Sequence, residues 1–109
     1  MFNINFMSLD LKTLQQEVDD WIKNNGGYWH PLSILAQSQE ELGELAREIN
    51  SRYGGRVRKS PDEVYDIGEE ICDVIFALVC MANYHNIDLQ EYWTQTIGAR
   101  CERDKNRYK

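Results

Sequence analysis

Residues 69–82 read EEICDVIFALVCMA, and from Ile71 onward nearly every side chain is apolar. A helix that is apolar on almost all of its faces has to be buried, so this segment is predicted to be a core helix. Asp73 lies inside it, and a buried carboxylate needs a basic partner, hydrogen bonds or a metal ion. No Lys or Arg occurs between Lys59 and Arg100, so this helix offers Asp73 no basic partner.

Working outward from this segment, the sequence predicts a chain of four helices and no strands. Apolar residues recur at helical spacing, glycine pairs end the first two helices, and Asp88 is placed to cap the last. Ser60 is a plausible N-cap of the third helix, with Pro61 at its first position. The predicted helices are Ser8 or Asp10 to Asn24, Pro31 to Tyr53, Pro61 to His85, and Leu89 to Arg103. We therefore expect a single all-α domain over residues 1–109.

Charge and composition exclude several classes of protein. The chain has 18 acidic and 12 basic residues, a net charge of −6, which argues against nucleic-acid binding through a basic face. No uninterrupted apolar stretch is long enough to span a membrane, and the N-terminus lacks the pattern of a signal peptide. The three cysteines have no CxxC spacing and are predicted to be free thiols. We expect a cytoplasmic protein without a membrane or nucleic-acid partner.

Four acidic residues on the second and third helices form the strongest functional pattern. Glu41 and Glu44 are three residues apart, as are Glu70 and Asp73, so each pair leaves one face of its helix. If the two helices are antiparallel neighbours, all four carboxylates can meet at one point. Oxygen ligands alone favour a hard cation such as Mg²⁺, Mn²⁺ or Ca²⁺. The two histidines lie outside any Glu-x-x-His spacing beside these acids, which weakens a di-iron or zinc interpretation.

A solvated acidic face is the alternative to a metal site. Taken singly, Glu40, Glu48 and Glu69 are as readily explained in that way as by a function. The four acids together, with Asp73 inside an apolar run, favour the metal site.

Aromatic and basic residues near the acidic helices have two possible roles. Trp29, in the segment YWH before the second helix, is a candidate wall of a ligand site, although a packed loop that covers helix ends is slightly favoured. Trp21 and Phe76 are expected in the core. The loop with Arg56, Arg58 and Lys59 could meet phosphates, but a solvated run of charges is the favoured interpretation. These aromatic and basic assignments are weaker than the acidic pattern.

The two acidic motifs resemble a known family. EELGE, residues 40–44, resembles the EExxE half of the MazG-type all-α nucleoside triphosphate pyrophosphohydrolase signature, and EICD, residues 70–73, resembles its ExxD half. The resemblance extends from about Leu11 to Tyr108. It implies a four-helix MazG-like fold that is completed by oligomerisation, as a homodimer or homotetramer.

The resemblance also implies a chemistry and a set of residues for it. A nucleoside triphosphate would be converted to the monophosphate and pyrophosphate, with Mg²⁺, or alternatively Mn²⁺, as the cofactor. The implied metal ligands are Glu41, Glu44, Glu70 and Asp73. Glu40, Glu41 and Glu44 form the implied catalytic set, in which Glu40 orients or deprotonates the attacking water and Glu44 is the alternative. Housecleaning of non-standard nucleotides is the implied biological role.

The last helix departs from the family pattern. Where related proteins carry a K-x-N pattern that contacts phosphate and substrate, this chain has Ala99 and Cys101. Arg100, Arg103, Lys105 or Arg107 could supply the positive charge instead. An arginine one position away points about 100° round the helix, so it is not an equivalent replacement.

Two other functions stay open from the sequence. The departures on the last helix favour a non-catalytic helical oligomerisation module that has kept its metal site, whereas the two intact acidic motifs favour the enzyme. A protein that binds divalent cations without a nucleotide is the third interpretation.

Overall fold

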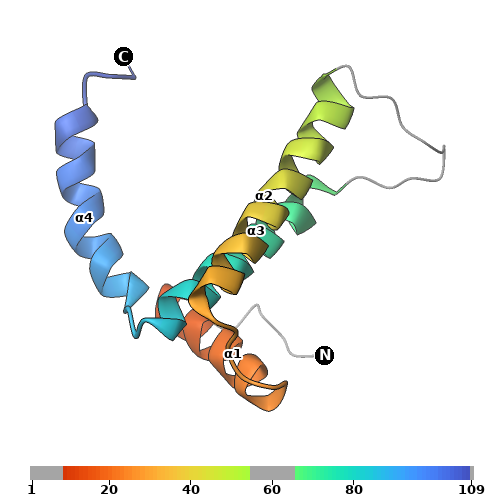
Figure 1. Ribbon diagram of the computed structural model, residues 1–109. Coiled ribbons are helices and arrows are strands. Elements are labelled where there is room, and N and C mark those ends of the chain that lie inside the picture. The colour runs from red at the N-terminus through yellow and green to blue at the C-terminus, as the bar shows by residue number, and fades with distance from the viewer. Residues whose placement is uncertain (1–8, 55–65, 109) are drawn as a thin grey trace.

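The computed structural model describes residues 9–54 and 66–108, and all regular structure in these ranges is helical. Figure 1 shows α2 and α3 as a long pair, with α1 near one end of the pair and α4 set apart from it. The helices are α1 (Leu11–Asn24), α2 (Pro31–Tyr53), α3 (Ile67–Tyr84) and α4 (Leu89–Asp104). The predicted all-α fold is confirmed. No helix in these two ranges is long and apolar enough to cross a membrane.

Side chains at the helix starts explain why three of the helices begin where the sequence predicts. The Asp10 carboxylate accepts a hydrogen bond from the Thr13 N–H at 2.8 Å, and the Asp88 carboxylate accepts one from the Glu91 N–H at 3.2 Å. Pro31 is the first residue of α2, which the preceding His30 caps. Each cap satisfies a backbone donor that the helix itself leaves free.

The start of α3 differs from the prediction. Ser60 and Pro61, the expected cap and first residue, lie outside the described residues. The described helix begins at Ile67, after Asp66, which has extended backbone angles and accepts a hydrogen bond from the Glu69 N–H at 3.1 Å. An acidic side chain in the first turn is favoured by the positive end of the helix dipole. The prediction of a helix running unbroken through Asp66 is therefore wrong, because Asp66 takes the capping position of the described helix.

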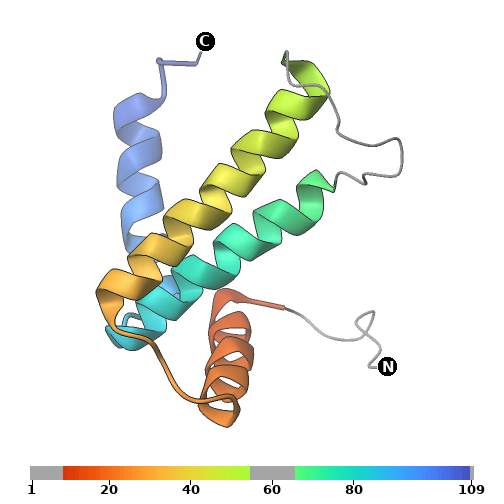
Figure 2. The ribbon, with the colours of Figure 1, turned by 45° about the vertical axis from the view of Figure 1, so that its right-hand side comes forward.

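Helices α2 and α3 are antiparallel and form the main packing interface of the chain (Figure 2). The core lies where α1 joins this pair, around the buried side chains of Val18, Ile34, Val79 and Cys80. Gln15 of α1 is buried with them, and its amide group donates to the Ile87 carbonyl oxygen at 2.8 Å. A buried amide with its hydrogen bonds made fixes the position of α1 against the connection between α3 and α4.

Much of the apolar surface of α3 is exposed in the single chain. Ile71, Ile75 and Leu78 each leave about half of their surface uncovered. The expectation that this helix is buried on every face is therefore wrong for one chain, since α1 and α2 cover only part of it. Helix α4 has no buried residue at all. These surfaces are the physical reason to consider a second copy of the chain, which is taken up below.

Candidate active site

Three of the predicted acidic residues meet between α2 and α3. Glu41 of α2 and Glu70 and Asp73 of α3 each place a carboxylate oxygen within 4.8 Å of the other two. Glu70 and Asp73 can do so together because residues three apart share a helix face. The antiparallel pairing of α2 and α3 then brings Glu41 opposite them, as the spacing predicted.

Repulsion and burial both act on the acidic cluster. Burial raises the pKa of the Glu70 carboxyl group, and the charges of Asp73, Glu44, Glu48 and Glu41 raise it further. Within residues 9–54 and 66–108, no Lys or Arg forms an ion pair with Glu41, Glu70 or Asp73. The cluster therefore lacks a protein cation among the described residues. Its donors are all carboxylate oxygens, which fits a hard divalent cation such as Mg²⁺ or Mn²⁺.

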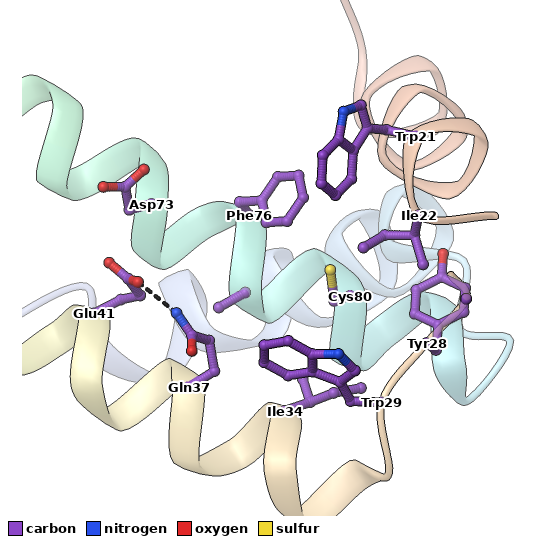
Figure 3. Close-up of a pocket in the computed structure, with 12 residues that line it drawn as sticks. Trp21, Ile22, Tyr28, Trp29, Ile34, Gln37, Glu41, Asp73, Phe76 and Cys80 are labelled. Carbon is purple, nitrogen blue, oxygen red and sulfur yellow. Dashed lines mark hydrogen bonds between the residues drawn. The ribbon is translucent and has the colours of Figure 1, made fainter. Parts of the chain in front are cut away.

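A neighbouring amide holds Glu41 in place. The Gln37 side chain, one turn earlier on α2, donates a hydrogen bond from Nε2 to Oε1 of Glu41 at 2.5 Å (Figure 3). Gln37 was not among the predicted site residues. Its position four residues before Glu41 was the available signal, because side chains at this spacing are neighbours on a helix. Partners of this kind orient ligand carboxylates and tune a metal site.

The exposure of the other acidic side chains, and of Asp73, differs in part from what the sequence predicts. Glu44 is exposed and lies outside the group formed by the other three, so the structure does not bring all four predicted ligands together. Glu40 is also exposed. Asp73 is exposed in the single chain, where burial was expected, because its side of α3 is uncovered. Glu48 is buried, whereas a solvated position was an equal expectation.

An aromatic pocket of about 270 Å³ adjoins the acidic cluster. Glu41 and Asp73 stand at one end of it, and Trp21, Trp29 and Phe76 line its walls (Figure 3). The Trp21 and Phe76 rings meet edge to face, with centroids 6.0 Å apart. Trp29 is 60% exposed and was a predicted site residue.

Trp21 and Phe76 were expected in the core, which is wrong. They are 56% and 39% exposed, and their rings line the opening between α1 and α3. Helical periodicity places a side chain on the inward face but does not distinguish a filled core from a pocket wall.

Tyr28 anchors the segment that carries Trp29. Its hydroxyl donates a hydrogen bond to Asp19 of α1 at 2.5 Å. Burial, and then this hydrogen bond to the Asp19 carboxylate, raise the pKa of Tyr28 to about 12. Gly26 and Gly27 take the positive φ angles that the turn needs, +105° and +84°. The turn therefore presents Trp29 to the pocket from a fixed position.

The predicted basic contacts on α4 do not reach the acidic cluster of the same chain. Figure 1 shows α4 set apart from the α2–α3 pair. Arg100 and Arg103 pair with Asp104, at 3.9 Å and 3.1 Å, and Lys105 pairs with Glu102 at 2.7 Å. The basic loop around residues 56–59 lies outside the described residues.

A comparison with protein families identifies the family to which this chain belongs. Residues 30–108 match the model of a family described as the MazG nucleotide pyrophosphohydrolase domain. The chain belongs to the MazG family. The matched range contains Glu41, Glu70 and Asp73, so the MazG resemblance of the two acidic motifs is confirmed.

Proteins that are similar in sequence and structure cover most of the chain. The uncharacterized protein YpjD of Bacillus subtilis (strain 168) is 43% identical over 99 residues, which are 90% of this chain and 89% of YpjD. A crystal structure of B. subtilis YpjD superposes with a TM-score of 0.75 at 41% identity, and the match covers 86% of this chain and 97% of that one. A crystal structure of the Bacillus-conserved MazG protein, a nucleotide pyrophosphohydrolase, gives a TM-score of 0.71 at 39% identity. The match covers 86% of this chain and 92% of that one. The four-helix MazG-like fold is thereby shown.

Proposed function

We propose that this chain hydrolyses a nucleoside triphosphate to the monophosphate and pyrophosphate with the help of Mg²⁺ or Mn²⁺. The observation that carries this proposal is the position of three carboxylates at one end of an aromatic pocket. Membership of the MazG nucleotide pyrophosphohydrolase family supports the same reaction.

Glu41, Glu70 and Asp73 are the proposed ligands of the cation. Their oxygens are already close together, and the Gln37 amide restrains Glu41. Glu44 is exposed and can join them if its side chain rotates. When bound there, Mg²⁺ would contact phosphate oxygens and neutralise the charge that develops on the phosphoryl group.

The pocket residues are proposed to bind the base. The Trp29 and Phe76 rings offer flat apolar surfaces. Every nucleobase can stack on an aromatic side chain, so such a surface binds different bases with similar strength. With the base in the pocket, the phosphates nearest the sugar lie beside Glu41 and Asp73. This arrangement favours cleavage between the α and β phosphorus atoms and disfavours loss of the terminal phosphate.

Glu40 is the proposed group that orients or deprotonates the attacking water, with Glu44 as the alternative. Both side chains are exposed on α2, where Glu40 directly precedes Glu41 and Glu44 follows Glu41 by three residues. A carboxylate within hydrogen-bonding distance of the water acts as a general base.

A homo-oligomer is proposed to cover the apolar faces of α3 and α4. The exposed surfaces of Ile71, Ile75 and Leu78 lie on the helix that carries Glu70 and Asp73. Burying apolar surface of this kind stabilises association by roughly 25 cal/mol per Å². Light scattering is expected to give at least the mass of a dimer, and a monomer mass at micromolar concentration would contradict this.

A non-catalytic oligomerisation module is the rival function. Ala99 and Cys101 favour it, because α4 lacks the expected phosphate contacts and its arginines pair with Asp104. A panel of ribonucleoside and deoxyribonucleoside triphosphates should be incubated with the protein in Mg²⁺ and in EDTA. Pyrophosphate release only with Mg²⁺ is the expected result. Cation binding without release from any nucleotide would favour the module or a simple cation-binding protein.

A further inference from the structure

The side chain of Gln37 lies where the aromatic pocket meets the acidic cluster. Gln37 is half-buried on α2 and lines the pocket together with Trp29, Glu41 and Asp73. Figure 3 shows it between the ring of Trp29 and the carboxylate of Glu41. Under the proposed function, the base stacks on Trp29 and the phosphates meet the cation at Glu41. Gln37 then stands beside the sugar, which joins the base to the phosphates.

The hydrogen bond to Glu41 fixes which end of the Gln37 amide faces the acidic cluster. An amide group carries an NH₂ donor at one end and a carbonyl acceptor at the other. An ionised carboxylate only accepts hydrogen bonds, so Gln37 has to turn Nε2 towards Oε1 of Glu41, as observed at 2.5 Å. The carbonyl oxygen of Gln37, its own Oε1, is thereby left for a different partner.

This carbonyl oxygen is an acceptor without a donor. Within the part of the chain that the structure describes, no group donates a hydrogen bond to Oε1 of Gln37. The indole N–H groups of Trp21 and Trp29 can only donate, so they do not offer a ligand the acceptor that Gln37 offers. A half-buried acceptor that loses its water to an incoming ligand needs a donor from that ligand. Gln37 therefore favours a ligand that carries a hydrogen-bond donor at this point.

The hydroxyl groups of the sugar are the donors that a nucleotide carries between its base and its phosphates. We propose that the carbonyl oxygen of Gln37 accepts a hydrogen bond from a sugar hydroxyl of the bound nucleotide, so that Gln37 determines specificity for the sugar. This inference rests on the proposed function, because it names the part of the same substrate that Gln37 contacts. The 2′- and 3′-hydroxyl groups share this chemistry, and the analogues used below distinguish them.

A contact with the sugar and a role in orienting Glu41 have different consequences. A site that holds a substrate hydroxyl rejects the analogue without it, because the acceptor is then left unpaired. For one neutral hydrogen bond, the expected loss in kcat/KM is about tenfold. A role in orienting Glu41 alone would affect every nucleotide equally, since all of them need the same cation.

Four triphosphates of one base test the sugar contact on the unaltered protein. They are the ribonucleotide and its 2′-deoxy, 3′-deoxy and 2′,3′-dideoxy analogues, assayed in saturating Mn²⁺ so that cation affinity does not enter. Loss of the contacting hydroxyl should lower kcat/KM about tenfold, and loss of the other hydroxyl should have little effect. The dideoxy analogue should match the poorer of the two single analogues. Equal kcat/KM for all four, with pyrophosphate released, would overturn the sugar contact and leave the proposed function standing.

The variant Gln37→Leu tests whether Gln37 is the acceptor. It should lose the discrimination and cleave the four triphosphates with the same kcat/KM, whatever its overall rate. Gln39→Leu, at an exposed position of the same helix, is the matched control and should discriminate as wild type does. Discrimination by Gln37→Leu equal to that of wild type would overturn the proposal, because another group would then hold the hydroxyl.

Binding of nucleoside monophosphates decides the question even where no triphosphate is cleaved. Trp21 and Trp29 line the pocket, so their fluorescence reports its occupancy. In wild type, the Kd of the ribonucleoside monophosphate should be about tenfold below that of the analogue without the contacting hydroxyl, and Gln37→Leu should lose this ratio. The same Kd for every analogue, or binding of none, would overturn the sugar contact. Discrimination in binding without cleavage of any triphosphate would support the contact and overturn the proposed reaction.

Discussion

The amide of Gln37 donates a 2.5 Å hydrogen bond to the carboxylate of Glu41 across one turn of α2. Glu41 is the one member of the three-carboxylate group that comes from α2, so this bond fixes the contribution of that helix to the site. The acceptor oxygen is charged, which makes the bond shorter and stronger than one between neutral groups.

Removal of this bond should weaken cation binding. Gln37→Leu keeps a side chain of similar size and leaves Glu41 free to rotate. Affinity for Mn²⁺ is expected to fall about tenfold, the usual lower limit for losing a group that orients a metal ligand. Gln39→Leu, an exposed position on the same helix, is the control and should bind as wild type does. Equal affinity of Gln37→Leu and wild type would show that the bond does not orient Glu41.

Asp73→Asn should have opposite effects with and without a cation. In EDTA the variant should unfold at the same temperature as wild type or higher, because one charge leaves a cluster that repels itself. The charge of Asp73 helps to raise the pKa of Glu70, and a raised carboxyl pKa lowers stability at pH values above it. This advantage of the variant should therefore shrink as the pH falls through the raised pKa of Glu70, and it should be absent below the ordinary pKa of the group, 4.5.

In saturating Mg²⁺ the order should invert. Wild type gains about 2.7 kcal/mol at a cation concentration one hundred times its Kd, and the variant gains less. Mg²⁺-dependent turnover should also be largely lost in the variant. If Asp73→Asn melts well below wild type in EDTA, Asp73 serves the fold, and its assignment as a ligand has to be dropped.

Tyr28→Phe should destabilise the segment that carries Trp29 in a pH-dependent way. The pKa of Asp19 is lowered, first by the hydrogen bond from Tyr28 and then by Lys23. A lowered carboxyl pKa contributes stability above the unfolded value, 3.8, which is lost as the pH falls through the folded value. Loss of the bond is expected to cost about 1 kcal/mol at pH 7 and less at pH 2.

Thermal unfolding at the two pH values measures this difference. Tyr53→Phe is the matched control, since Tyr53 is exposed and its hydroxyl makes no hydrogen bond within the described residues. A loss of stability that is the same at pH 7 and pH 2 would rule out Asp19 as its source.

Trp29→Ala should weaken substrate binding with little effect on folding. Stacking of one base on an aromatic ring contributes roughly 1–3 kcal/mol, so the KM should rise between about fivefold and about 150-fold. The unfolding temperature should change little, since the side chain is mostly exposed. Tyr108→Ala, which removes another exposed ring, should leave KM unchanged. An unaltered KM in Trp29→Ala would show that the base does not bind in this pocket.

The sequence predicts the acidic group well because helical spacing and antiparallel pairing are geometric constraints. Glu41, Glu70 and Asp73 meet for that reason. It does not predict that Glu44 stays exposed, because spacing fixes the face of a helix and leaves the side-chain conformation open.

Burial is harder to predict than helix position. Glu48 is as readily explained by the sequence as a solvated acid as by a function, yet the structure buries it. Trp21 of α1 looks like a core residue, yet more than half of its surface stays exposed and its ring becomes a pocket wall. Both outcomes depend on how far each helix overlaps its neighbour, which the pattern of a single helix does not contain. The start of α3 after its cap, Asp66, likewise depends on one local hydrogen bond.

Identification of the reaction products by ³¹P nuclear magnetic resonance tests the central claim most directly. Wild type, incubated with Mg²⁺ and the nucleoside triphosphate that it consumes fastest, should yield the nucleoside monophosphate and pyrophosphate in equal amounts. The same mixture in EDTA should remain unchanged. A nucleoside diphosphate with orthophosphate, or turnover that persists in EDTA, would contradict the account.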